Sequence, residues 1–345
     1  MISIITRLKL NKLNKFFLNG LSNLLGIKIV HTFYRYDHIL KRPILNATLL
    51  LPGRGCSWAK KNGGCTMCGF KDALSSVGIN RSFEDDEILH LFEISWPTIE
   101  KKQPMVVNIY NGGSFLNDNE LPYYIQRMII KRFKESESVR TLLVESRPEF
   151  IKQGRLQEIA PITETKVLKI GIGLESATDT VRNSYINKGI SKEDYENAVR
   201  IAKQSGIRVL TYILIKPLYM SEKDAISDAI DSAKYAFDIG SDEVSFEACC
   251  IQKGTRMEEL YRRGQYTPPW LWSIIEVLRA THNLGNIQIG SFWDFPAPVA
   301  KPRNCRRCSK RVENLLNQYR IVHDISIFDN IDCRCKLEWR KSLEV

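Results

Sequence analysis

Three cysteines without an accompanying histidine, Cys56, Cys65 and Cys68, lie in the glycine-rich stretch GRGCSWAKKNGGCTMCGF at residues 53–70. Thiolates at this spacing can bind one metal centre. A structural zinc site usually takes four protein ligands, which this stretch does not supply. Glycine lets the backbone wrap closely around a large centre. The stretch therefore predicts a [4Fe–4S] cluster with one iron open to a further ligand, and a structural zinc site is the alternative.

Four more cysteines near the end of the chain form a different pattern. Cys305 and Cys308 make a Cys-x-x-Cys pair, and Cys333 and Cys335 make a Cys-x-Cys pair. Four thiolates in two close pairs are typical of a closed tetrahedral zinc site, and a metal would stabilise a module with so little core of its own. We expect structural zinc here, with a second iron–sulfur cluster as the alternative.

The composition is that of an ordinary globular protein, with 345 residues of which 43% are hydrophobic and 26% charged. The nine cysteines are odd in number and tightly clustered, which favours metal binding in a reducing compartment over a disulfide framework. No apolar run is long enough for a transmembrane helix, and lysines and an arginine interrupt the N-terminal apolar residues. We therefore expect a cytoplasmic protein.

The net charge of +11 is concentrated at both ends of the chain. No acidic residue precedes Asp37, and five cations are bunched within residues 303–311. Basic ends of this kind indicate a polyanionic partner such as nucleic acid. A solubilising excess of charge explains them equally well.

Apolar runs alternate with amphipathic stretches along most of the chain, a pattern that predicts parallel strands and covering helices. Strands are expected at 44–52, 104–110, 140–146, 165–176, 207–217 and 242–251, and helices at 84–94, from about residue 120, at 191–206 and after Ser221. Six such repeats favour a partial (β/α)6 TIM-like barrel over an open sheet. The predicted organisation is a basic helical extension at 1–43, the barrel at 44–295 and a small four-cysteine module at 296–345.

In such a barrel the active-site residues lie at the carboxyl ends of the strands. The candidate residues at these ends, besides the first three cysteines, are Met67, Phe70, Asn111, Gly112, Gly113, Ser114, Glu145, Arg147, Glu175 and Glu247. Each polar side chain taken alone could equally be part of a salt bridge at the barrel rim.

The cysteine triad at the first strand end resembles the radical S-adenosylmethionine (radical SAM) superfamily, and its long first spacing resembles the Elp3-like branch. The resemblance implies that S-adenosylmethionine binds the open iron. It further implies that Asn111–Ser114 match a Gly-Gly-Glu motif facing the cofactor's amino group, with Ser114 departing from the usual acid. Met67 would lie near the adenine, and Phe70 would also contact the cofactor. Glu145 and Arg147 would lie near the sulfonium or carboxylate, and Glu175 near the ribose.

Several stretches in order, including VNIYNGGSF, ESRPEFI and GIGLESATDTVRNSYINKG, resemble the archaeosine-biosynthesis (RaSEA) family of radical SAM proteins from about residue 44 onward. That resemblance implies action on position 15 in the D-loop of tRNA, where a 7-deazaguanine carries a lysine attached by the archaeosine synthase ArcS. Cleavage of the lysine carbon–nitrogen bond would leave archaeosine. Glu247 would act as an acid or base, ArcS as protein partner and a low-potential donor as electron source.

Two alternatives are open at this point. One is another Elp3-like radical enzyme with a different substrate, although a methylthiotransferase would need a second three-cysteine cluster. The other is a non-enzymatic zinc-dependent RNA-binding protein.

Overall fold

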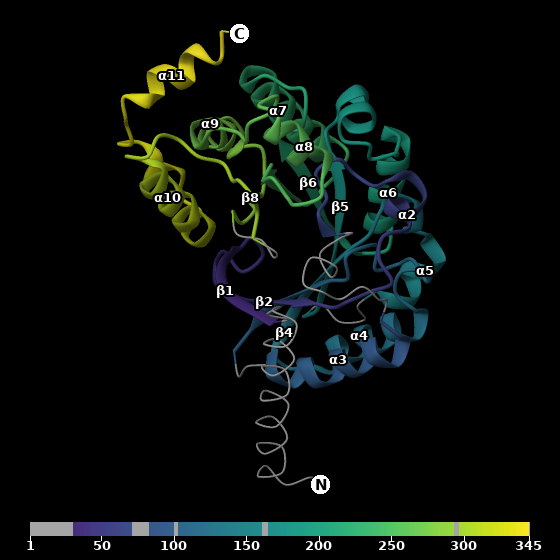
Figure 1. The fold of residues 1–345 in the computed structure, drawn as a ribbon. Helices are drawn as coiled ribbons and strands as arrows, with labels where there is room; N and C mark the ends of the chain where they lie inside the picture. The colour runs from purple at the N-terminus through teal and green to yellow at the C-terminus, as the bar shows by residue number, and fades with distance from the viewer. Residues whose placement is uncertain (1–29, 71–82, 100–102, 161–164, 293–296, 345) are drawn as a thin grey trace.

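A single curled sheet of eight strands forms the centre of the molecule (Figure 1). The computed structural model describes residues 30–70, 83–99, 103–160, 165–292 and 297–344. The strands, which pair in chain order, are β1 Val30–Asp37, β2 Arg42–Leu50, β3 Met105–Tyr110, β4 Val139–Glu145, β5 Val167–Glu175, β6 Arg208–Ile215, β7 Glu243–Ala248 and β8 Ile287–Ile289. Strands β2 to β8 are parallel, and β1 runs antiparallel to β2 at one edge.

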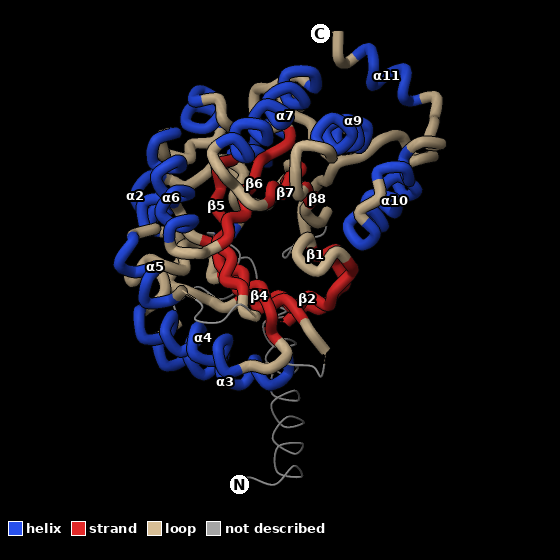
Figure 2. Tube along the Cα trace, turned by 180° about the vertical axis from the view of Figure 1, so that it is seen from behind, coloured by secondary structure: helices blue, strands red, loops and turns tan. Residues whose placement is uncertain are grey.

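Helices cover the outer face of this sheet, and the strands curl around an inner face (Figure 2). The α-helices are α2 Ser57–Asn62, α3 Asp85–Ile99, α4 Tyr123–Glu135, α5 Gln153–Ile159, α6 Lys192–Gln204, α7 Glu222–Asp238, α8 Arg256–Arg262, α9 Leu271–Thr281, α10 Ser309–Val322 and α11 Cys335–Lys341. Shorter helical turns occupy Pro148–Phe150, Thr180–Tyr185 and Ile325–Phe328. None of the helices in the described ranges is long and apolar enough to cross a membrane.

Alternation along each strand separates an apolar outer face from a polar inner one. In β5, for example, Leu168, Ile170 and Ile172 are fully buried in the large apolar cluster under the helices. The intervening Lys169 forms a buried ion pair with Glu243 of β7, with 2.6 Å between Nζ and Oε1. The inside of the barrel is therefore lined by polar and charged groups, which suits a binding site better than a packed core.

The predicted six parallel strands and partial barrel are confirmed by β2 to β7, and β8 adds a short seventh parallel strand. The helical extension expected through residue 43 is wrong for residues 30–37, which form β1, while residues 1–29 lie outside the described residues. The stretch VHTFYRYD is rich in β-branched and aromatic residues, and its half-exposed position at the sheet edge tolerates its charged side chains. Helix α4 begins at Tyr123 rather than near Glu120, directly after Pro122.

The four-cysteine module at residues 296–345 does not have a core of its own. Val312 and Leu316 of α10 are fully buried in one apolar cluster together with Val244 and Phe246 of β7 and Ile287 of β8. Helix α10 also packs against β1. The module thus covers the seam where the curled sheet brings its first and last strands near each other.

Candidate active site and metal centres

The three cysteines of residues 53–70 lie just beyond the carboxyl end of β2. Cys56 is the residue before helix α2, and Gly63 and Gly64 follow that helix with φ angles of +77° and +78°. Residues with a side chain rarely adopt two such angles in succession, so both glycines are needed for this turn. The turn reverses the chain and brings Cys65 and Cys68 back beside Cys56, close enough for the three thiols to interact electrostatically.

Residues that follow β5 hold the cysteine loop from the other side of the barrel mouth. The Thr66 amide donates to the Ile186 carbonyl at 2.9 Å, and its hydroxyl donates to the Tyr185 carbonyl at 2.8 Å. Asn187, with a φ of +59°, donates from Nδ2 to the Gly64 carbonyl at 2.8 Å. The triad is therefore positioned by a loop more than 100 residues away in sequence, as the sequence separation of 123 between Asn187 and Gly64 shows.

Burial raises the pKa of Cys65 and raises that of Cys68 to about 11, and the neighbouring thiols add to both shifts. At neutral pH these two thiols are protonated unless a positive centre offsets the burial. A metal centre does this, because thiolates bind it with release of their protons. The half-buried triad thus has the chemistry of a site that binds a metal centre when its thiols release their protons.

Glu120 organises this region, although no motif around it predicts such a role. Its carboxylate is fully buried and accepts from the Ser57 amide at 2.9 Å, the Asn117 side chain at 2.8 Å and the Ser114 amide. Ser57 begins the helix after Cys56, and Ser114 ends the loop after β3. One carboxylate therefore ties the cysteine loop to the predicted cofactor loop. Only its tertiary contacts reveal this role, because in sequence it looks like the first acid of a helix.

The loop Asn111–Ser114 is shaped for close approach by other groups. Gly112 has a φ of +66°, and a Cβ on Gly113 would lie 2.2 Å from the Glu120 carboxylate. The Asn111 side chain is buried, and neither its amide nitrogen nor its oxygen has a hydrogen-bond partner among the described residues. Buried amides without partners are rare and usually mark a missing ligand or water. These features fit a polar cofactor held beside the cysteines.

Arg147 lies between this loop and the segment after β5. Its guanidinium is buried over the Trp58 ring, 4.8 Å from the ring centroid, and it donates to the Lys188 carbonyl at 2.9 Å and to Glu149 at 2.6 Å. A third donation, at 3.3 Å, goes to the Gly189 carbonyl. In this conformation Arg147 braces the cysteine-loop helix, and its predicted contact with the cofactor stays a prediction.

Glu175 ends β5 in a backbone conformation that is unusual for a residue with a side chain, with a φ of +66° at a bulge in the ladder. Its carboxylate pairs with Lys188, with 2.6 Å between Oε1 and Nζ, and both side chains are buried. Gly173 makes room, because a Cβ there would lie 2.3 Å from either charged group. Lys188 also interacts with the Cys65 thiol. Sequence reasoning missed this lysine, whose role comes from the folded contact with Glu175.

Two further acids face the inside of the barrel and are partly accessible. Burial raises the pKa of Glu145 and of Glu247 to about 7, and Glu247 adds to the shift of Glu145. Tyr212 lowers the pKa of Glu145, although its hydroxyl is shielded from solvent and makes no hydrogen bond of ordinary geometry within the described ranges. Carboxyl groups with a pKa near neutrality can hold or release a proton at the pH of the cell.

Met67 and Phe70, both predicted to contact the cofactor, lie in different surroundings. Met67 is partly buried and packs against an apolar cluster that includes Ile186 and Leu218. Phe70 is 52% exposed, and residues 71–82 that follow it lie outside the described ranges. The structure thus brings together the cysteine triad, Met67, the Asn111–Ser114 loop and the acids at the strand ends, with Phe70 at their margin.

The four C-terminal cysteines form a much tighter group, with all sulfurs within 4.8 Å of one another. The Sγ–Sγ distances are 3.7 Å for Cys305–Cys308, 3.6 Å for Cys305–Cys333 and 3.5 Å for Cys308–Cys335. Four sulfurs held about 2.3 Å from one ion at tetrahedral angles lie about 3.8 Å apart. The spacing therefore fits a single tetrahedral ion, and the indole of Trp272 donates to the Cys335 sulfur at 3.4 Å.

The first three cysteines are not part of so tight a group among the described residues. A cluster of several irons holds its thiolates farther apart than a single ion does. The open triad and the closed quartet therefore differ in ligand spacing as well as in ligand number.

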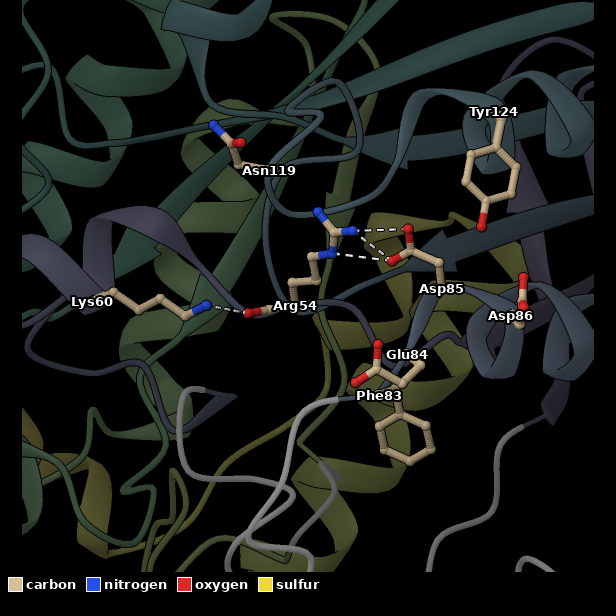
Figure 3. Close-up of a pocket in the computed structure, with 8 residues that line it drawn as sticks. All are labelled: Arg54, Lys60, Phe83, Glu84, Asp85, Asp86, Asn119 and Tyr124. Atoms are coloured by element: carbon tan, nitrogen blue, oxygen red, sulfur yellow. Dashed lines mark hydrogen bonds and ion pairs between the residues drawn. The ribbon is translucent and has the colours of Figure 1, made fainter.

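A polar hollow of about 490 Å³ lies outside the barrel mouth and contains none of the cysteines (Figure 3). Arg54, two residues before Cys56, points across it and forms an ion pair with Asp85 at the start of α3, at 2.6 Å (Figure 3). Lys60 donates to the Arg54 carbonyl. The hollow thus contains contacts that fix the start of the cysteine loop.

Comparison with known proteins agrees with this arrangement. The family model of the Radical SAM superfamily matches residues 50–230, which begin at the last residue of β2 and include the cysteine triad and strands β3 to β6. The described fold is also similar to the archaeal Methanocaldococcus infernus Elp3 with an N-terminal deletion, with a TM-score of 0.49 and 15% identity over 83% of this chain and 64% of that chain.

Two relatives extend the similarity over nearly the whole chain. The archaeosine synthase subunit beta of Methanosarcina acetivorans is 35% identical over 304 residues, which are 86% of this chain and 85% of the relative. The archaeosine synthase subunit beta of Thermococcus kodakarensis is 31% identical over 311 residues, which are 89% of this chain and 94% of the relative. The chain belongs to the Radical SAM superfamily of enzymes and, within it, to the family of these archaeosine synthase beta subunits.

Proposed function

We propose that this enzyme cleaves the lysine carbon–nitrogen bond of the lysine-bearing 7-deazaguanine at position 15 of tRNA, leaving the amidine of archaeosine. The observation that carries the proposal is the convergence of Cys56, Cys65 and Cys68 at the carboxyl end of β2, at the mouth of a barrel lined by polar groups. Family membership supports the substrate, since the relatives are named for archaeosine synthesis.

In this proposal Cys56, Cys65 and Cys68 hold a [4Fe–4S] cluster, and S-adenosylmethionine binds beside it. When bound, the pair supplies a 5′-deoxyadenosyl radical. The unpartnered Asn111 amide and the Gly113 backbone would contact the cofactor, with Glu175 at its ribose. Glu120 keeps the two loops in register, and Lys188 places a positive charge beside Cys65. Glu145 and Glu247, with a pKa of about 7, can hold or move a proton at the substrate.

The C-terminal quartet would hold structural zinc. Its sulfur spacing of 3.5–3.7 Å supports a single ion over a second iron–sulfur cluster. The arginines around it line a hollow of about 520 Å³ together with the cysteines. Their positive charge would suit contact with the phosphates of tRNA.

Three partners follow from this function. They are tRNA, a synthase such as ArcS that attaches the lysine, and a low-potential electron donor.

The test is anaerobic reconstitution followed by incubation with S-adenosylmethionine, a reductant and tRNA that carries the lysine adduct. We expect about four irons at the triad and conversion of the adduct to archaeosine in nucleoside mass spectrometry. The variant Cys65→Ala loses both, whereas Cys250→Ala, outside both metal sites, keeps both. Cofactor cleavage with an intact adduct would point to another substrate, and zinc alone at the triad would refute the enzymatic proposal.

A further inference from the structure

Two arginines from opposite ends of the chain meet inside the barrel where the sheet's first and last strands approach each other. Arg35 of β1 donates from Nη2 to the carbonyl of Ile289 at the end of β8, at 3.1 Å. Arg320 of α10 lies with its guanidinium 5.8 Å from the centroid of the Phe33 ring. Both side chains are partly buried, and burial together with Arg35 lowers the pKa of Arg320 to about 10. The two guanidinium groups therefore act on each other in a poorly hydrated place.

Among the described residues, neither arginine is neutralised by a direct partner. Within the described ranges neither forms an ion pair with an acid at 4.0 Å or less, and the Nε of Arg320 is shielded from solvent without any hydrogen-bond partner. Arginine has five N–H donors in a rigid fork, and the contact of Arg35 with Ile289 uses only part of this capacity. Buried cations are normally paired or bound to an anion. The pair therefore has the properties of an anion receptor.

The carboxylate of Glu247 lies beside this pair of arginines, so the region contains both positive and negative charge. Arg35 and Arg320 are the cations that act most on its carboxyl group. Ser245 donates to its Oε1 at 2.8 Å, and Gly290 stands so close that a Cβ there would lie 1.8 Å from Oε2. The backbone of residue 290 and the Ser245 hydroxyl thus fix the direction of the carboxylate.

Different charged side chains lie near the cysteine triad and near Glu247. The charged side chains that act most on Cys65 are Lys188 and Glu175, whereas those that act most on Glu247 are Arg35 and Arg320. The arginine pair and Glu247 thus form the end of the site away from the triad. A substrate group that reacts near the triad, and carries an ammonium and a carboxylate at the far end of a flexible chain, matches this arrangement of charges.

We propose that Arg35 and Arg320 bind the α-carboxylate, and Glu247 the α-ammonium group, of an amino-acid arm on the substrate. This inference rests on the proposed function, in which the arm is lysine and its other end reacts. The methylene chain of lysine separates the reacting carbon from both charges. Arginine forks bind carboxylates in two-point geometry, and such contacts are stronger than neutral hydrogen bonds. This inference gives Glu247 the binding of a charge in place of proton transfer, which is left to Glu145.

The test crosses variants with substrate analogues that each lack one charge. Nucleosides or tRNA carrying the lysine adduct are compared with a cadaverine adduct, which has no carboxylate, and with a 6-aminohexanoate adduct, which has no ammonium. For wild type, either deletion lowers kcat/KM about 10- to 100-fold, since each removes a charge-assisted contact. Arg320→Met and Arg35→Met lower kcat/KM by a similar factor on the lysine adduct. On the cadaverine adduct, their kcat/KM equals that of wild type. Glu247→Gln adds nothing on the 6-aminohexanoate adduct.

Control measurements separate this role from structural damage and from failure of the proposed function. Arg320→Lys should recover part of the loss, and Lys310→Met, exposed on the same helix, should not show the pattern. Equal losses for the arginine variants on the lysine and cadaverine adducts would overturn the carboxylate receptor, and a loss for Glu247→Gln on every substrate would return Glu247 to proton transfer. If wild type converts none of the adducts while it cleaves S-adenosylmethionine, the proposed function fails and the receptor fails with it.

Discussion

Glu120 and Glu247 are both carboxylates near the same site, yet Glu120 is fully buried and Glu247 is partly accessible, and their hydrogen-bond partners differ. Glu120 accepts two backbone N–H groups and the Asn117 amide, so its charge is stabilised by fixed donors. Among the described residues Glu247 accepts from one hydroxyl, that of Ser245, and burial raises its pKa to about 7. Glu120 therefore serves as a hydrogen-bonded anchor between two loops, whereas Glu247 can hold or release a proton near neutral pH. The two therefore support different predictions.

The variant Glu120→Gln should lose the connection between the cysteine loop and the Asn111–Ser114 loop. An amide can accept fewer of the N–H groups that now meet the carboxylate, and each buried donor without a partner costs about 1–3 kcal/mol. We expect a lower melting temperature and less than the full complement of iron after reconstitution. Glu135→Gln, exposed on α4, is the matched control. Normal iron binding in Glu120→Gln would contradict the assigned role.

The pH dependence of kcat/KM should rise through about pH 7. The folded-state pKa of Glu247 is raised to about 7, so the free enzyme carries this group protonated below that pH and ionised above it. If the ionised form binds substrate, activity grows as the proton leaves. Glu247→Gln should lower activity above pH 7 and flatten this part of the profile. An unchanged inflection in the variant would assign it to another group, for which Glu145 is the first candidate.

At the scale of elements, the seam between β1 and β8 depends on α10. The His323 ring, after α10, stacks on Tyr36 of β1 with centroids 4.9 Å apart and contacts His38 edge-on at 4.5 Å. Its Nε2 also meets the Ile287 carbonyl at 2.7 Å. Among the described strands, β1 and β8 do not pair with each other. The cluster of Tyr36, His38 and His323 covers the open edge between them.

This cluster predicts a specific sensitivity to acid. Burial lowers the pKa of His38 to about 3, with further contributions from His323 and the cations Lys169, Arg35 and Lys41. Between about pH 6.5 and 3 the unfolded chain binds a proton that the folded chain excludes, so stability falls as pH falls through that window, by about 2 kcal/mol from this group between pH 7 and 5. His38→Gln should reduce the drop in stability between these pH values, measured by chemical denaturation.

The exposed histidine at position 90 provides the comparison, because His90→Gln should keep the full acid sensitivity of wild type. An equal drop in wild type and His38→Gln would show that the seam histidine does not titrate on unfolding.

The elements also show which parts of the fold the sequence could predict. Parallel strands buried on both faces appear as continuous apolar runs, so β2 to β7 were found close to their true bounds. Strand β1 was missed because it alternates exposed and half-buried residues at an edge. The cysteine sets were visible from spacing alone, whereas the roles of Glu120, Lys188 and Arg320 depend on partners brought near by folding, which spacing does not encode.

At the scale of the whole molecule, the C-terminal cysteine quartet lies in the same apolar core as the last strands of the barrel. Cys308 and Cys335 are buried in the apolar cluster that contains Phe246 and Ile289 of the last two strands. Loss of the metal proposed there should therefore disturb the barrel seam as well as the C-terminal helices. The arginine receptor would be affected too, because Arg320 is carried by α10.

The variant Cys333→Ala should lose one zinc per chain, measured by elemental analysis, while the triad keeps its iron. Removal of one ligand of a structural zinc site weakens metal binding and destabilises the segment it holds. We expect a lower melting temperature and a loss of substrate binding greater than the loss of iron. Loss of iron from Cys333→Ala, with no change in zinc, would show that the quartet holds an iron–sulfur cluster.

The most direct test of the central claim follows one hydrogen atom. The lysine adduct is prepared with deuterium on the side-chain carbon next to the amidine nitrogen and incubated anaerobically with reconstituted enzyme, S-adenosylmethionine and reductant. We predict archaeosine in the tRNA and deuterium in the 5′-deoxyadenosine that forms with it, both absent for Cys65→Ala. Undeuterated 5′-deoxyadenosine beside an intact adduct would contradict the claim that this barrel cleaves the lysine carbon–nitrogen bond.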